Sequence, residues 1–83
     1  MTEEQKRRLE DLRLLSAEIE RLSDEHEAVS RPVSQRAIWA QLQACKAERR
    51  ERVTALVRDG VEAALVAPAA DLTRSRVAML GRG

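Results

Sequence analysis

The sequence has 83 residues, 15 of them basic and 14 acidic, so its formal net charge is +1. A chain of this length is expected to form one small domain over residues 1–83, and its balanced charge is not that of a protein that coats a polyanion. Apolar residues make up 43% of the chain and charged residues 35%, which is too apolar for a disordered chain and too charged for a membrane protein.

The residue inventory also excludes several kinds of site. One Trp, with no Phe or Tyr, provides no platform on which bases could stack, and one Cys with one His cannot form an internal disulfide or a zinc site. No phosphate-binding glycine loop, paired-carboxylate site or nucleophile motif is present. We therefore expect no enzymatic activity, no cofactor and no small-molecule substrate. Because the sequence shows no secretory signal and no long apolar run, we also expect a cytoplasmic protein without a membrane partner.

The first helix is predicted over about residues 2–29. Thr2, followed three residues later by Gln5, has the pattern of a capping box, and Glu3–Arg7 and Glu4–Arg8 are spaced for ion pairs on one face. Residues spaced alternately by three and four then form a stripe, which we call the seam: Leu12, Leu15, Ile19, Leu22, His26 and Val29. Such a heptad stripe predicts a helix that packs along a partner helix.

A turn is predicted over residues 30–33, because Pro32 disfavours helical geometry at the residue before it. The second helix is predicted over about 34–66, and its part of the seam comprises Ile38, Leu42, Cys45, Arg49, Val53, Leu56, Gly60 and Ala64. Gly60 either ends this helix or lies inside it, and the helical spacing of the apolar residues on both sides favours continuation. A short third helix is predicted over about 68–80, with Pro68 in its first turn and Gly81 just after its end.

Two long helices joined by a short turn predict an all-α, antiparallel helical hairpin. In the expected register Leu22 faces Leu42, Leu12 faces Val53, and Gly60 faces Gln5. The apolar stretch over residues 61–66 then extends past the start of the first helix. It must be covered by the C-terminal segment folding back, by a second copy or by another protein. The overhang and the thin two-helix core favour a homodimer, most simply a four-helix bundle with two-fold symmetry.

Charge is divided unevenly, with a net −4 over residues 1–27 and a net +5 over residues 28–58. Arg49, Arg50 and Arg52 form the densest cationic cluster. They could form salt bridges to acidic residues of the first helix, namely Glu10, Asp11 and Glu18, or they could contact phosphates or an acidic protein surface. The first interpretation is favoured for the cluster as a whole.

Three further side chains have both a chemical and a structural interpretation. His26 could be a general base or a half-buried spacer beside Trp39 or Ile38, and the spacer is favoured. Cys45 is interpreted as a small apolar residue rather than a reactive thiol. Trp39 could anchor an interface or close the apolar end of the bundle, and the two interpretations are equally supported.

These patterns predict a non-enzymatic protein–protein interaction module: a small adaptor, inhibitor or regulatory subunit that forms a homodimer and binds another protein through its helical surface. The candidate partner-binding residues are Trp39, Arg49, Arg50, Arg52, Val61 and Leu65. The alternative is a nucleic-acid-binding helical-hairpin dimer that uses the arginine face of the second helix.

Overall fold

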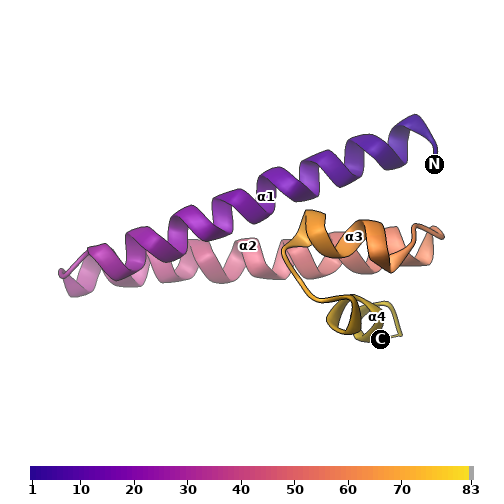
Figure 1. Cartoon of the computed structure of the whole chain (residues 1–83). Helices are drawn as coiled ribbons and strands as arrows, with labels where there is room; N and C mark the ends of the chain where they lie inside the picture. The colour runs from indigo at the N-terminus through magenta and orange to yellow at the C-terminus, as the bar shows by residue number, and fades with distance from the viewer. Residues whose placement is uncertain (83) are drawn as a thin grey trace.

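Two long antiparallel helices dominate the computed structural model, which describes residues 1–82 (Figure 1). Helix α1 spans Glu3–Ala28 and helix α2 spans Pro32–Arg58, and the two pack against each other. Two short helices, α3 over Ala63–Ala70 and α4 over Arg74–Arg82, lie at the end of the hairpin where α1 begins and α2 ends. Within residues 1–82 the predicted all-helical hairpin is confirmed.

The capping box at the start of α1 is also confirmed. The Thr2 hydroxyl accepts from the Gln5 backbone N–H at 3.1 Å, and the Gln5 side chain accepts from the Thr2 backbone N–H at 3.0 Å. The ion pairs predicted from Glu3 to Arg7 and from Glu4 to Arg8 are not formed. Glu3 pairs with Lys6 at 3.2 Å, and Arg8 reaches across the hairpin to Asp59. Arg8 takes this partner because its position in the register faces the end of α2.

The turn between the long helices is shorter than predicted. Helix α1 ends at Ala28, and α2 already begins at Pro32 rather than near Ser34. Proline suits the first position of a helix because the N–H that it lacks would have no partner there. The Gln35 side chain donates to the Val29 carbonyl oxygen at 2.6 Å and so ties the start of α2 to the end of α1.

Helix α2 ends at Arg58, so the predicted continuation to residue 66 is wrong. Gly60 has a φ of +89°, in the left-handed region that glycine adopts most easily. Its N–H donates to the Val57 carbonyl at 3.1 Å, and the Val61 N–H donates to the Leu56 carbonyl at 3.1 Å. This pair of hydrogen bonds is the Schellman motif, in which the residue after the glycine packs back on the helix. Val61 is accordingly buried in one core cluster with Leu56.

The single helix predicted over residues 68–80 is likewise wrong, because α3 and α4 are separated by a second Schellman-type turn. Asp71 adopts a φ of 55°, and the N–H groups of Asp71 and Leu72 donate to the carbonyls of Pro68 and Ala67 at 3.3 and 3.0 Å. Pro68 lies inside α3, with its side chain exposed, rather than in a first turn. Gly81 lies within α4 instead of after it.

The buried side chains form two clusters along the hairpin. The cluster at the four-helix end comprises Leu12, Val53, Leu56, Val61, Val66, Ala67, Ala70 and Val77. The cluster in the other half, which we call the outer half, comprises Ile19, Leu22, Ile38 and Leu42, with Leu15 partly buried against it. The predicted register is confirmed, because Leu12 shares a cluster with Val53 and Leu22 shares one with Leu42. The Gln5 side chain also donates to the Asp59 carbonyl at 3.2 Å.

The predicted overhang is partly covered by the chain itself, since Val61 and Val66 are buried and Leu65 stays 45% exposed. Helix α3 packs on α1, and α4 packs on α2 and α3, so the C-terminal segment folds back over the apolar stretch. Of the three coverings that the sequence left open, the structure shows this one. The outer half, by contrast, remains only two helices thick (Figure 1).

Candidate functional site

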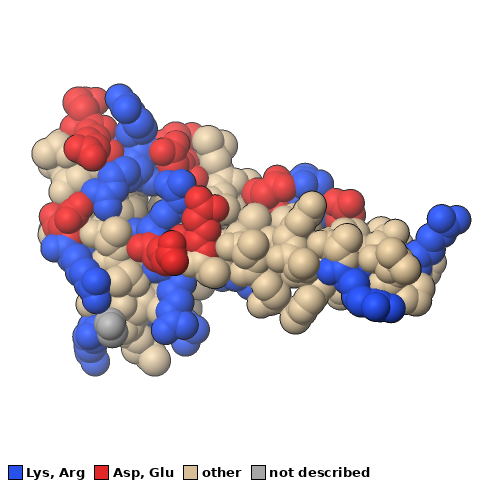
Figure 2. Space-filling view, turned by 180° about the vertical axis from the view of Figure 1, so that it is seen from behind, with Lys and Arg blue, Asp and Glu red and all other residues tan. Residues whose placement is uncertain are grey.

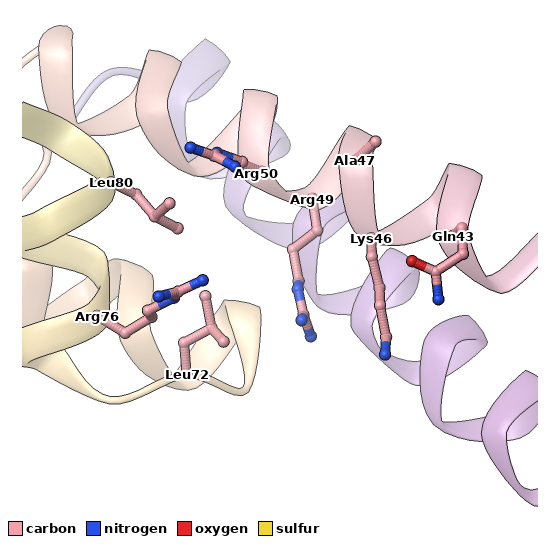
Figure 3. Close-up of a pocket in the computed structure, with 8 residues that line it drawn as sticks. All are labelled: Gln43, Lys46, Ala47, Arg49, Arg50, Leu72, Arg76 and Leu80. Carbon is pink, nitrogen blue, oxygen red and sulfur yellow. The ribbon is translucent and has the colours of Figure 1, made fainter. Parts of the chain in front are cut away.

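The side chains of the three arginines predicted as one cluster, Arg49, Arg50 and Arg52, lie in different environments. Arg52 pairs with Glu48 of its own helix at 2.9 Å. Arg49 is half-buried, and its guanidinium donates to the Ala70 carbonyl at 3.4 Å, at the C-terminus of α3 where a cation is favoured. Arg50 is exposed and lies between α2 and α4 (Figure 3).

The bridges predicted between this cluster and the acidic residues of α1 are not formed. Glu10 pairs with Arg13, and Glu18 pairs with Arg21, each three residues away on the same helix. The hydrogen bond from Arg13 lowers the pKa of Glu10, and that from Arg21 lowers the pKa of Glu18. A partner on the neighbouring helical turn is within easy reach, so Glu10 and Glu18 are paired within α1. Among residues 1–82, no ion pair joins Lys46, Arg49 or Arg50 to a carboxylate.

Helices α2 and α4 enclose a depression of about 470 Å³, which we call the basic hollow (Figure 3). It is lined by Gln43, Lys46, Ala47, Arg49, Arg50, Leu72, Arg76 and Leu80. Four of these side chains are cationic, three are apolar and none is acidic. Helix α4 is held against α2 beside the hollow, where the Thr54 hydroxyl lies 3.3 Å from the Leu80 carbonyl oxygen.

A second surface of α2 lies on the side away from the core. Five exposed small apolar residues, which we call the alanine stripe, are spaced alternately by four and three: Val33, Ala37, Ala40, Ala44 and Ala47. This spacing keeps them on one side of the helix, whereas Ile38 and Leu42 of the core lie on the opposite side. In the view from behind, charged groups crowd the four-helix end, and much of the outer half is uncharged (Figure 2).

Trp39 and His26 lie together in the outer half. Their ring centroids are 5.8 Å apart with a tilt of 47°, and the Trp39 side chain is 51% exposed. The predicted neighbourhood of His26 is therefore confirmed, since His26 is half-buried beside Trp39. Cys45 is half-buried against the outer cluster, as expected of a small apolar residue.

The two aliphatic residues predicted to bind a partner have different environments. Val61 is only 5% exposed, because the turn after α2 folds it into the core, so it is inaccessible to a partner. Leu65 is 45% exposed and lies near Met1 and Leu9 at the start of α1.

The seam does not predict the alanine stripe or the place of Arg76 in the basic hollow. The alanine stripe has a clear signal, the same alternation of three and four that reveals the seam, on the other side of the same helix. Arg76 has no such signal, because its place in the basic hollow depends on how α4 folds back.

No protein-family model, curated protein or solved structure matches this chain. None of the described helices is long and apolar enough to cross a membrane. Within residues 1–82, no group of three or more His, Cys, Asp or Glu side chains is placed to hold a metal ion.

Proposed function

We propose that this chain is a non-enzymatic protein–protein interaction module, a small adaptor, inhibitor or regulatory subunit that docks a helix of its partner on the alanine stripe. The observation that carries the proposal is a second heptad stripe on α2, exposed along its length and unused by the hairpin. Small side chains at heptad positions allow two helix backbones to approach closely, so this stripe can accept another helix.

The residues beside the stripe fit this use. Helical geometry places Arg36 and Gln43 along one edge and Gln41 and Glu48 along the other. Polar residues in these positions solubilise the free surface and select the partner's register and orientation. The exposed ring of Trp39 lies outside the stripe, so it is available as a second contact at the edge of the interface.

The experiment is site-specific photo-crosslinking. A photoreactive residue replaces Ala44 in the stripe, and the matched control replaces Ala17, which is equally small and exposed but lies on α1. We expect a discrete adduct with a defined protein from position 44 and none from position 17. The adduct should disappear when Ala40→Glu is added. Equal labelling from both positions would show that the stripe is not the docking surface.

We also propose that two copies associate through the alanine stripes of their outer halves when no partner helix occupies the stripes, which would bring four helices together with the two α2 helices in contact. Two observations support this arrangement: the outer half is only two helices thick, and its exposed stripe can pair with itself about a two-fold axis.

Nucleic-acid binding is the second candidate, and the basic hollow favours it. Within residues 1–82, Lys46, Arg49 and Arg50 of α2 form no ion pairs with the acidic residues of α1. Arg76 of α4 adds a fourth positive charge to the hollow. If the hollow contacts a backbone, exchanging Arg50 and Arg76 for Gln should weaken binding equally for all sequences. The log–log salt slope should fall by about one for each lost phosphate contact. Binding unchanged by the double exchange would remove this candidate.

A further inference from the structure

The basic hollow brings together cations from two helices that are distant in the sequence. Lys46, Arg49 and Arg50 come from α2, and Arg76 comes from α4 (Figure 3). Arg49 is anchored by its hydrogen bond to the Ala70 carbonyl, whereas the other three cationic side chains are exposed. One fixed and three adjustable cationic groups can therefore converge on a single ligand.

This arrangement carries an electrostatic cost that a bound anion would lower. Like charges gathered on one surface repel each other, and no carboxylate among residues 1–82 lines the hollow. An anion that binds here relieves the repulsion, and docking of α4 adds to that repulsion because it brings Arg76 to the three cations of α2. Such a ligand binds the folded state and not the unfolded chain, so it must raise the stability of the fold.

We infer that the basic hollow is a binding site for a phosphate group, carried on a small organic molecule or in a nucleic-acid backbone. A phosphate ester carries up to two negative charges and several acceptor oxygens, so it can take hydrogen bonds from several guanidinium groups at once. A single carboxylate has fewer acceptors and one charge for four cations.

The hollow also has room for more than the phosphate. Its volume of about 470 Å³ is within the range of small-molecule sites, and Leu72 and Leu80 provide an apolar wall beside the cations. The ligand class that fits both parts is a phosphate ester with a compact apolar or aromatic group.

The test is calorimetric titration and thermal unfolding with four probes: inorganic phosphate, inorganic pyrophosphate, phenyl phosphate and a short DNA duplex. Sodium chloride keeps the ionic strength constant. The variants are Arg50→Gln and Arg76→Gln. The matched control is Arg7→Gln, which removes the same charge from an exposed position on α1. Circular dichroism verifies that every variant keeps the helical content of the parent.

We expect pyrophosphate to bind and to raise the unfolding midpoint beyond the effect of chloride. Each hollow variant should weaken this binding about tenfold or more, as for a lost hydrogen bond to a charged group, and Arg7→Gln should leave it unchanged. Phenyl phosphate binding more tightly than inorganic phosphate would identify a small organic ester as the ligand class. Duplex binding that exceeds both and is lost in the same variants would identify a backbone. No binding beyond chloride, or equal loss in Arg7→Gln, would overturn the site.

Discussion

The structure requires glycine at positions 60 and 81 for two different reasons, backbone conformation at Gly60 and lack of space at Gly81. Gly60 is needed for its backbone conformation, since a Cβ there would meet nothing within 4 Å but φ is +89°. Gly81 is needed for space, since a Cβ there would lie 2.5 Å from Cγ1 of Val57. The close approach of α4 to α2 therefore depends on one missing side chain.

This contact predicts a specific coupling between positions 57 and 81. Gly81→Ala should destabilise the parent by about 1–3 kcal/mol, because an added methyl overpacks a close helix contact. In a Val57→Ala background only the Cβ of residue 57 remains in the way, 3.2 Å from the added methyl, so the same exchange should cost markedly less, since alanine also favours helix over glycine by about 1 kcal/mol. Urea unfolding of the four proteins measures the coupling. The same cost of Gly81→Ala in both backgrounds would contradict the packing.

Ser16 is the buried polar residue that links α1 to α3. It is 7% exposed, and its hydroxyl lies 2.8 Å from the Ala69 carbonyl oxygen and 3.0 Å from that of Leu12. Ser16→Ala should lower the unfolding free energy by about 1–2 kcal/mol, because a part-buried carbonyl loses its donor. Ser75→Ala, at an exposed position of α4, is the control and should change stability by less than about 0.5 kcal/mol. Equal effects in a denaturant titration would show that the Ser16 contact is not formed.

At the scale of elements, the sequence predicts what local patterns determine. The capping box, the hairpin and its register follow from Thr2, Pro32 and the seam. The end of α2 does not, because helical spacing continues through Gly60 whether or not the helix does. The helix ends here because the Schellman turn buries Val61 against Leu56. This tertiary contact leaves no trace in the spacing of the apolar residues.

The candidate surfaces divide in the same way. Arg50 is exposed, as its position beside the seam predicts, and Trp39, for which an interface anchor and a closing residue are equally supported by the sequence, is exposed as well. The overhang predicts that Val61 contacts a partner, but Val61 is buried in the core instead. The basic hollow could not be predicted, because Arg76 joins it only through the docking of α4 on α2.

The two halves of the hairpin should differ in local stability. The four-helix end buries eight residues in its cluster and the outer half buries four. Local opening of the outer half exposes less apolar surface, so its amides should exchange faster with solvent. In hydrogen-exchange experiments we expect lower protection around Leu22 and Leu42 than around Leu12 and Val53. The difference should shrink at concentrations at which a second copy covers the outer half. Uniform protection in dilute protein would show that the hairpin opens as one unit.

For the whole molecule, the features that still favour a dimer lie in the outer half. Val61 and Val66 of the apolar stretch over residues 61–66 are buried within the chain, so these two residues no longer require a second copy. The alanine stripe and the two-helix thickness of the outer half still favour association, because pairing two stripes buries apolar surface on both copies and gives each thin half a second layer.

Light scattering over micromolar concentrations should therefore show a mass that rises from 9.3 kDa towards twice that value. Ala44→Glu places a carboxylate in the centre of the stripe, and it should hold the protein as a monomer, since two like charges would meet across the two-fold axis. Ala17→Glu adds the same charge to an exposed position on α1 and should leave association intact. Helical content by circular dichroism should match in all three proteins. A parent protein that keeps the monomer mass at every concentration would contradict the proposed dimer and leave a different protein as the partner of the stripe. Association that survives Ala44→Glu would place the dimer interface on another face.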